Sequence, residues 1–197
     1  MDRYEFRVWG NELSSLKRIL EEVAQSSKPT KSNELYLVSK TTDNCNVKIR
    51  SGLLDVKVLI GIDKTLERWR PIVKAGFPLT ASTIEPLFES LALKPPRLLR
   101  SNYSFDEFLD EVVKSEHALV TANASKERIQ FKMKACETEY AAVTINGLRR
   151  HTVAVEGSDL DSVLSLIQQL GIEQIQNTSY IHEIKHLLLD PNPRLQS

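Results

Sequence analysis

The feature that most constrains the fold is a strict alternation of residue types near the N-terminus. In segment 3–9 (Arg-Tyr-Glu-Phe-Arg-Val-Trp), charged residues alternate with apolar ones. A period of two predicts a β-strand with one polar and one apolar face. Comparable patterns predict strands at 35–39, 47–50, 53–60, 65–73, 117–122, 128–135, 137–145 and 148–156, with a further short strand at 97–100.

The polar faces of these strands carry charge rather than the neutral polar residues of an ordinary outer sheet face. The charged positions are Arg3, Glu5, Arg7, Lys48, Arg50, Asp55, Lys57, Arg128, Lys132 and Lys134. One alternative is an open sheet that packs on helices and holds these charges in water. The other is a closed barrel with a mostly basic lumen, which would suit a compact polyanion. The residue pattern alone leaves both open.

Helices are predicted between and after the strands. Asn11 can cap a helix with an apolar stripe up to Val23, and Ser104 and Glu107 form a capping box. Pro29 is expected to break the chain between 26 and 33, and Asn146-Gly147 predicts a tight hairpin. The end is expected to be helical, from a cap at Ser158 to Gly171 and again over 179–189. We expect one α+β domain over 1–197, since no linker divides the chain.

Composition excludes several classes of protein. The 26 Lys and Arg residues balance the 26 Asp and Glu residues, so general nucleic-acid binding is not expected. The charged N-terminus does not resemble a signal peptide, and no apolar run reaches the roughly 18 residues of a membrane span. Two cysteines, Cys45 and Cys136, do not make a disulfide framework. A cytoplasmic protein is therefore expected.

The order of the charged motifs resembles the CYTH (triphosphate tunnel) family. The first strand of that family carries Glu-x-Glu-x-Lys, and this chain has Arg3-Tyr4-Glu5-Phe6-Arg7 there. Lys48-Ile49-Arg50, Asp55-Val56-Lys57 and Glu67-Arg68-Trp69-Arg70 resemble the next charged strands of the family, and Ala154-Val155-Glu156 resembles its late Glu-x-Glu. The similarity spans roughly the whole chain, although no single motif is intact.

The resemblance implies an antiparallel β-barrel of about eight strands, with helices packed outside and a helical C-terminus. It implies a tunnel that binds a triphosphate or polyphosphate, with Mg²⁺ or Mn²⁺ as cofactor. The implied catalytic residues are Glu5 and Glu156, which would also hold the metal with Glu137 and Glu139 as further candidates. The implied phosphate-binding residues are Arg7, Lys48, Arg50, Lys57, Arg68, Arg70, Lys132 and Lys134.

Two departures from the family pattern bear on catalysis. Arg3 replaces the first glutamate of the N-terminal motif with the opposite charge, and Ala154 replaces a glutamate of the late motif. A fixed cation at Arg3 would repel a metal ion, whereas the basic residues that hold phosphate remain. We therefore expect anion binding with weak or absent metal-dependent triphosphate hydrolysis. The alternative is a catalytically silent scaffold for a protein partner, whose identity the sequence does not indicate.

A second motif is His182-Glu183-Ile184-Lys185-His186, which matches the His-Glu-x-x-His of zinc proteases. The chain offers no third ligand at the spacing that those enzymes use, and Lys185 places a cation between the histidines. A solvent-exposed helix face that happens to carry two histidines is the favoured interpretation, and a zinc protease is a remote one.

Overall fold

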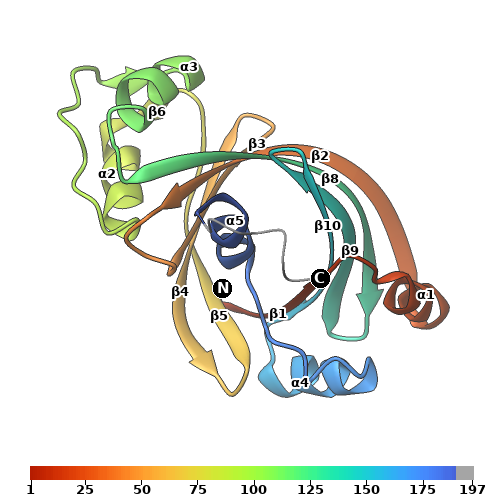
Figure 1. Cartoon of the computed structure of the whole chain (residues 1–197). Helices are drawn as coiled ribbons and strands as arrows, with labels where there is room; N and C mark the ends of the chain where they lie inside the picture. Colours follow the sequence, from red (N-terminus) through yellow and green to blue (C-terminus); the bar gives the residue numbers. More distant parts are fainter. Residues whose placement is uncertain (190–197) are drawn as a thin grey trace.

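Eight of the ten strands in the computed structural model, which describes residues 1–189, join into one closed antiparallel barrel (Figure 1). Around the ring the order is β1-β10-β9-β8-β2-β3-β4-β5. The strands are β1 (Arg3–Gly10), β2 (Ser26–Ser39), β3 (Cys45–Arg50), β4 (Leu53–Asp63), β5 (Leu66–Gly76), β8 (Leu119–Met133), β9 (Cys136–Ile145) and β10 (Leu148–Gly157). The predicted α+β barrel is confirmed, and the open-sheet alternative was wrong.

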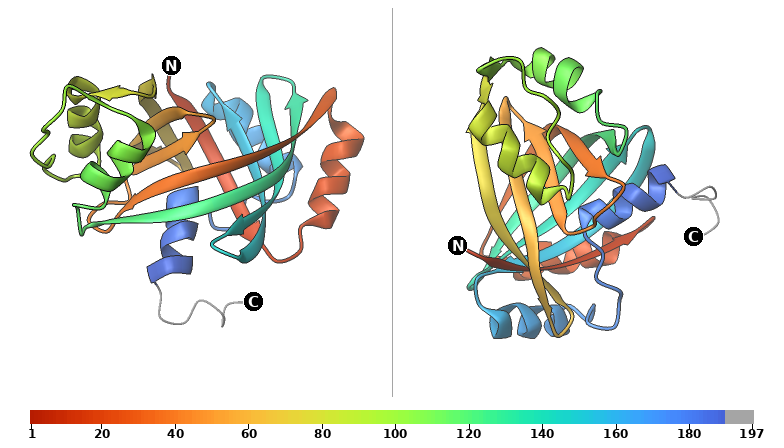
Figure 2. Two further views of the ribbon diagram at one scale, coloured as in Figure 1. Left: turned by 90° about the horizontal axis from the view of Figure 1, so that it is seen from above. Right: turned by 90° about the vertical axis from the view of Figure 1, so that its left-hand side faces the viewer.

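The helices form two groups outside the barrel and one element inside it. The helical elements are α1 (Ser14–Val23), α2 (Ala81–Ser90), α3 (Phe105–Glu107), a π-helix (Phe108–Val113), α4 (Leu160–Gln169) and α5 (Tyr180–Leu189). The short strands β6 (Leu79–Thr80) and β7 (Asn102–Tyr103) pair beside α2. Figure 2 shows α1 and the lobe of α2 and α3 at opposite sides of the barrel. Within residues 1–189, no helix is long and apolar enough to span a membrane.

Alternation along the strands directs apolar side chains outward under these helices. In β3, Val47 and Ile49 pack with Phe88 of α2 in one buried cluster. In β1, Phe6 and Val8 belong to a second cluster with residues of α1 and α4. Because successive side chains of a strand point to opposite faces, the charged residues between them face the interior. Apart from Lys134, which lies in the turn between β8 and β9, the charged faces that the sequence predicted are therefore the inner wall of the barrel.

Strand β2 is longer than predicted and includes Pro29, which was expected to break the chain. It pairs with β8 along its whole length, from Ser26 to Ser39, but with β3 only from Glu34 to Leu37. Residues 26–33 therefore have one free edge within the described barrel. Prolines in sheets are largely confined to such edges, because a proline has no N–H to donate to a ladder.

Other local predictions had mixed outcomes. The capping box of Ser104 and Glu107 is present, and Asn146 and Gly147 form the hairpin turn with φ of 45° and 89°. The segments predicted as two strands around 117–135 are the single strand β8, and segment 97–100 is not a strand. Helix α4 is capped by the side chain of Asp159 rather than by Ser158, and α1 has no side-chain cap at Asn11.

Helix α5 lies inside one end of the barrel instead of on its surface (Figure 1). Its buried residues Tyr180, Ile181, Ile184 and Leu187 pack against apolar inner residues of β2, β8 and β9. The side-chain amide of Asn177, just before α5, donates to the backbone carbonyls of residues 5 and 65 and accepts from the backbone N–H of residue 7. It thus bridges β1 to the start of β5, where the ladder between them has only three residue pairs.

Candidate functional site

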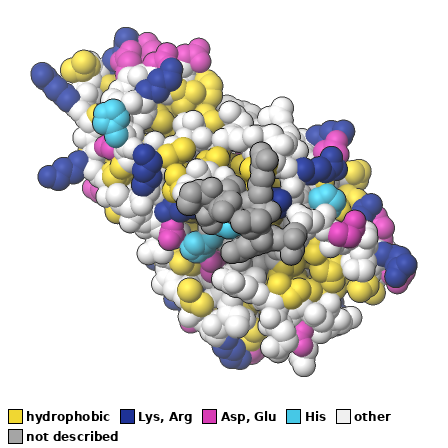
Figure 3. Space-filling view, viewed as in Figure 1, with side chains coloured by type: hydrophobic (Ala, Val, Ile, Leu, Met, Phe, Trp, Pro, Cys, Tyr) yellow, Lys and Arg dark blue, Asp and Glu magenta, His cyan; other side chains and the backbone are white. Residues whose placement is uncertain are grey.

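A charged cavity of ≈110 Å³ occupies the half of the barrel interior that α5 does not fill. Its cationic lining residues are Arg7, Lys48, Lys57, Lys126 and Arg128, and its carboxylates are Glu5, Glu137, Glu139 and Glu156. These side chains come from β1, β3, β4, β8, β9 and β10, so closure of the barrel is what brings them together. On the outer face seen in Figure 3, by contrast, acidic and basic side chains are intermixed.

Four carboxylates form a row across adjacent strands on the inner wall. Glu5 of β1 is the direct partner of Glu67 on β5 and of Glu156 on β10, and Glu156 is the partner of Glu137 on β9. Residues directly opposite each other in neighbouring strands have Cβ atoms about 4.5–5.5 Å apart and face the same side of the sheet. Such a row is stable only if cations or protons offset the repulsion between its members.

Arg3 and Lys57 supply two of these cations. Arg3 Nη2 lies 3.4 Å from Glu137 Oε2, and Arg3 Nε lies 3.6 Å from Glu156 Oε1. Lys57 Nζ donates to the same Oε1 of Glu156 at 3.5 Å. The carboxylates at the end of the row are therefore held by basic side chains of the chain itself.

Arg7 provides the third cation and sits at the centre of the charged half. Its Nε donates to Glu5 Oε1 at 2.8 Å, and its Nη1 lies 3.4 Å from Glu139 Oε1. Burial opposes ionisation of both carboxyl groups, but the nearby guanidinium outweighs it and lowers the pKa of Glu5 and of Glu139. The guanidinium carbon also lies 4.3 Å from the ring centroid of Tyr180, so α5 forms part of the floor under Arg7.

Lys126 lies deeper, at the border with the apolar half. Its Nζ is 2.6 Å from Glu34 Oε2, donates to the Tyr36 hydroxyl at 2.7 Å, and lies 3.7 Å from the centroid of the Tyr180 ring. Burial lowers the pKa of Lys126 to about 8, although Glu34 acts in the opposite direction. For Glu34, burial raises the pKa, but Lys126 and Lys48 outweigh it and bring it to about 2.

Glu67 is a buried carboxyl that the sequence analysis did not assign to the site. It accepts a hydrogen bond from Trp69 Nε1 at 3.0 Å, and His182 Nδ1 of α5 lies 3.7 Å from its Oε1. Burial and the neighbouring charge of Glu5 raise the pKa of Glu67 to about 7. The alternation in the sequence could have indicated this position. Glu67 and Trp69 alternate with Arg68 and Arg70, so either pair could have been predicted to face the lumen.

The structure brings together only part of the predicted phosphate-binding set. Arg7, Lys48 and Lys57 line the cavity, whereas Arg50 lies outside it and pairs with Glu34 at 3.4 Å. Arg68 and Arg70 project from the other face of β5, where they pair with Asp63 and Asp2 respectively. Lys132 lies at the mouth, exposed and in register with Glu137. Lys126 and Arg128 line the cavity but were not predicted as binding residues.

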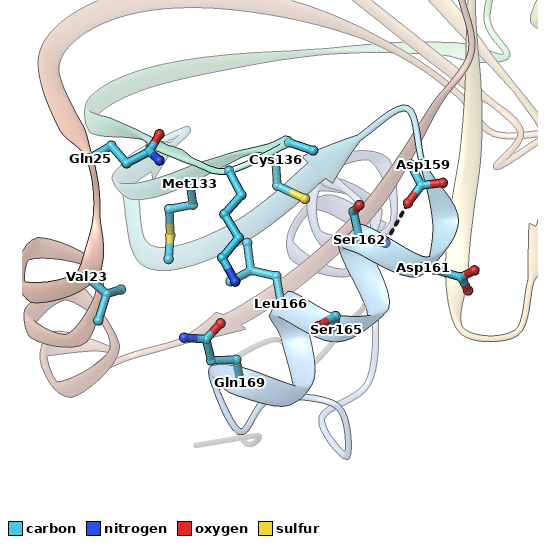
Figure 4. Close-up of a pocket in the computed structure, with 12 residues that line it drawn as sticks. Val23, Gln25, Met133, Cys136, Asp159, Asp161, Ser162, Ser165, Leu166 and Gln169 are labelled. Atoms are coloured by element: carbon cyan, nitrogen blue, oxygen red, sulfur yellow. Dashed lines mark hydrogen bonds between the residues drawn. The ribbon is translucent and has the colours of Figure 1, made fainter.

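Lys134 lines a different cavity, outside the barrel. That cavity of ≈400 Å³ lies between the end of α1, the β8–β9 turn and α4 (Figure 4). Its floor is apolar, with Met133, Cys136 and Leu166, and Asp159 at its edge caps α4 through the backbone N–H of residue 162. Although it is larger than the internal cavity, it contains none of the other residues predicted for the site.

The predicted metal ligands are close together but do not fit a metal ion as they are arranged. Glu5, Glu137, Glu139 and Glu156 each have a basic side chain within 3.6 Å. In the described part of the chain, no three His, Cys, Asp or Glu side chains are placed so that they could hold an ion. Mg²⁺ needs near-octahedral coordination by oxygen atoms. The carboxylate oxygens of these glutamates are instead paired with basic side chains.

The His-Glu-x-x-His motif lies on α5, where the side chain of Glu183 is 10% exposed and that of His182 is 42% exposed. Glu183 is buried and accepts from Arg150 Nε at 3.2 Å, and His182 Nδ1 lies 2.9 Å from the Ser179 hydroxyl. The motif thus anchors α5 to β10 and β5. His182 and His186 are partly exposed, so the favoured interpretation of a solvent-exposed face holds in part for the histidines but not for Glu183.

Comparison with solved structures places the barrel among known folds. A conserved hypothetical protein from Pyrococcus furiosus aligns over 92% of this chain and 98% of its own, with a TM-score of 0.53 and 14% identity. A putative adenylyl cyclase from Hippeastrum, described as having a dominant triphosphatase activity, aligns over 94% and 95%, with a TM-score of 0.51 and 11% identity. This chain has a CYTH-like fold.

The same CYTH-like barrel also aligns with a chain of the Mediator head module from Schizosaccharomyces pombe. That alignment covers 88% of this chain and 96% of the other, with a TM-score of 0.51 and 6% identity. No protein-family model matches the sequence, and no functionally curated protein matches it either. At these identities the likenesses establish the fold, and function has to be argued from the cavity.

Proposed function

We propose that the barrel binds a small phosphate-type polyanion, a triphosphate or a short polyphosphate, in its internal cavity. The observation that carries the proposal is the convergence of cationic side chains from β1, β3, β4 and β8 on one partly enclosed space. Charge-assisted hydrogen bonds from Arg and Lys are the usual means of holding phosphate oxygens. At ≈110 Å³ the cavity is below the roughly 300–1,000 Å³ of sites for drug-sized ligands, so only the anionic end of a larger molecule would enter it.

Lys48 and Lys57 are the cations most available to a ligand. Lys48 Nζ lies 3.8 Å from Asp55 and Lys57 Nζ lies 3.5 Å from Glu156. The pairs of Arg7 with Glu5 at 2.8 Å and of Lys126 with Glu34 at 2.6 Å are much tighter. An entering anion would therefore recruit the two lysines first, while Arg7 and Lys126 shape the floor.

The test is binding of inorganic triphosphate by calorimetry and by thermal shift. At a hundred times the dissociation constant, a ligand specific for the folded state adds about 2.7 kcal/mol of stability. For a chain of this size this corresponds to a rise in Tm of roughly 5–11 °C. The rise should shrink in Lys48→Ala and Lys57→Ala. Lys134→Ala removes the same charge outside the barrel and is the matched control. The absence of any shift at millimolar triphosphate would overturn the proposal.

Hydrolysis of the bound anion should be weak or absent. Phosphoryl transfer depends on electrostatic stabilisation by metal ions held on carboxylates. Here the carboxylates of Glu137 and Glu156 are engaged by Arg3, and that of Glu5 is engaged by Arg7. Release of phosphate from triphosphate in the presence of Mg²⁺ or Mn²⁺ measures this directly. Brisk turnover that Glu5→Gln or Glu156→Gln abolishes would contradict it.

A scaffold role is the second candidate. The observation that favours it is the internal neutralisation of the cavity, whose cations and carboxylates pair with one another. Buried pairs of this kind do not need a ligand to be satisfied. A structure of the Schizosaccharomyces pombe Mediator head module also contains a chain with this fold. Failure of triphosphate and longer polyphosphate to bind would leave this candidate in place.

A further inference from the structure

The carboxylate row of Glu67, Glu5, Glu156 and Glu137 raises the question of which cation neutralises it. In sites that bind phosphate groups next to carboxylates, a divalent ion commonly neutralises both. In this chain the guanidinium of Arg3 lies beside two of these carboxylates, at the edge of the cavity that they line. Arg3 bridges two neighbouring members of the row with two different nitrogens, Nη2 to Glu137 and Nε to Glu156.

Glu5 and Glu156 are held by further basic side chains, and Glu67 accepts a hydrogen bond from Trp69 Nε1 instead. Lys57 shares Oε1 of Glu156 with Arg3, and Arg7 holds Glu5. A divalent ion would have to displace these basic side chains from their carboxylates and then remain within a few ångström of them. Both steps oppose metal binding, because the displaced charges stay attached to the inner wall and repel the ion.

We propose that Arg3 takes the place of the divalent ion, so that the cavity selects the metal-free form of its polyanion. This inference rests on the proposed function, since it concerns the form in which the anion is bound. Arg3 and Lys57 already contribute the positive charge that a metal would bring with its ligand. A phosphate chain complexed with Mg²⁺ would carry less negative charge and would bring an ion that the row cannot accept. Excess Mg²⁺ should therefore compete with the protein for the ligand.

The first experiment is calorimetric titration of the protein with inorganic triphosphate, in EDTA and again with saturating Mg²⁺. We expect binding in EDTA and an affinity at least tenfold lower with Mg²⁺. Binding only in the presence of Mg²⁺ would overturn the inference while leaving the anion-binding function intact. Absence of binding in both conditions would instead reject the proposed function, so the two failures are distinguishable.

The second experiment tests Arg3 itself, with Mn²⁺ as a spectroscopic probe. We expect no stoichiometric Mn²⁺ on the unmodified protein by electron paramagnetic resonance. Arg3→Glu should acquire one bound Mn²⁺ and should bind triphosphate more weakly in EDTA. Arg3→Gln removes the positive charge without adding a negative one, so it disturbs folding less. It should also lower the affinity for triphosphate in EDTA. Arg70→Glu makes the same charge change on the outer surface and should alter neither property. Stoichiometric Mn²⁺ on the unmodified protein, or unchanged EDTA affinity in both Arg3 variants, would overturn the assignment.

Discussion

The two halves of the barrel interior share the strands β8 and β9 but are filled differently. On β8 and β9 the inner positions change along the strand, from Arg128 and Glu139 in one half to Ala124 and Val143 in the other. The charged half remains a cavity, whereas the apolar half is filled by α5. We therefore expect ligand binding to depend on the charged half and much of the stability to depend on the apolar half. The following variants test that division.

The largest effect is expected in the apolar half. Ile184 of α5 has no exposed surface and packs inside the barrel. Ile184→Ala removes buried methyl and methylene groups and leaves a cavity, which should cost about 2–5 kcal/mol of unfolding free energy. Denaturant unfolding measures the loss. Leu189→Ala, at a residue of the same helix that is 45% exposed, is the control and should change stability much less. A loss below 0.5 kcal/mol for Ile184→Ala would mean that α5 does not hold the barrel together.

A smaller effect on stability, which depends on pH, is expected in the charged half. Burial and Glu5 raise the pKa of Glu67 to about 7, from a usual value of 4.5. Folding thus favours the protonated carboxyl, so this group's contribution is complete below pH 4.5 and is lost as pH rises to 7. A shift of this size corresponds to about 3 kcal/mol.

Glu67→Gln should remove this dependence, which is measured as unfolding free energy at pH 4.5, 5.5, 6.5 and 7.5. The variant should be more stable than the unmodified protein at pH 7.5, with the difference vanishing near pH 4.5. Glu127→Gln, at an exposed glutamate on the outer face, is the control. Parallel pH profiles for the unmodified protein and Glu67→Gln would contradict the assignment.

The smallest effect is expected at the boundary between the halves. Among the described residues, the buried hydroxyl of Tyr180 has no hydrogen-bond partner, while its ring stacks on Tyr36 and lies against Arg7 and Lys126. Tyr180→Phe keeps the ring and removes an unsatisfied polar group, so stability should stay within about 1 kcal/mol or rise. Tyr180→Leu, which loses the ring face, should destabilise and weaken anion binding. A large loss in Tyr180→Phe would show that the hydroxyl has a partner.

The barrel was predictable because charge on the inner strand faces and the resemblance to CYTH motifs pointed to the same architecture. It was less predictable which of the two alternating sets of residues in each strand faces the lumen. In segment 67–70 the acidic residue and a tryptophan alternate with two arginines, and only one of the two sets can face the lumen. The sequence analysis chose Arg68 and Arg70, whereas the neighbours in β1 place Glu67 inward.

Two other parts of the site depended on tertiary context. Lys126 lay between two predicted strands, because the small residues around it show no clear alternation of polar and apolar side chains. Its role emerges only when β8 is continuous from Leu119 to Met133. Helix α5 has apolar residues on several sides, so its sequence is compatible with a place outside or inside the barrel. It lies inside because small residues on the inner wall leave room for it, among them Ala122, Ala124 and Ala141.

The pairing of β1 with β10 has a consequence for the time course of synthesis. Tyr4 is the partner of Gly157, so β1, the earliest barrel strand in the chain, has no neighbour on that side until some 150 residues later in synthesis. At about 5–20 residues per second, this interval lasts roughly 8–30 s. The Asn177 bridge forms later still. During that time the charged face of β1 favours its solubility, and the same residues that line the cavity of the finished barrel protect the nascent chain before the ring closes.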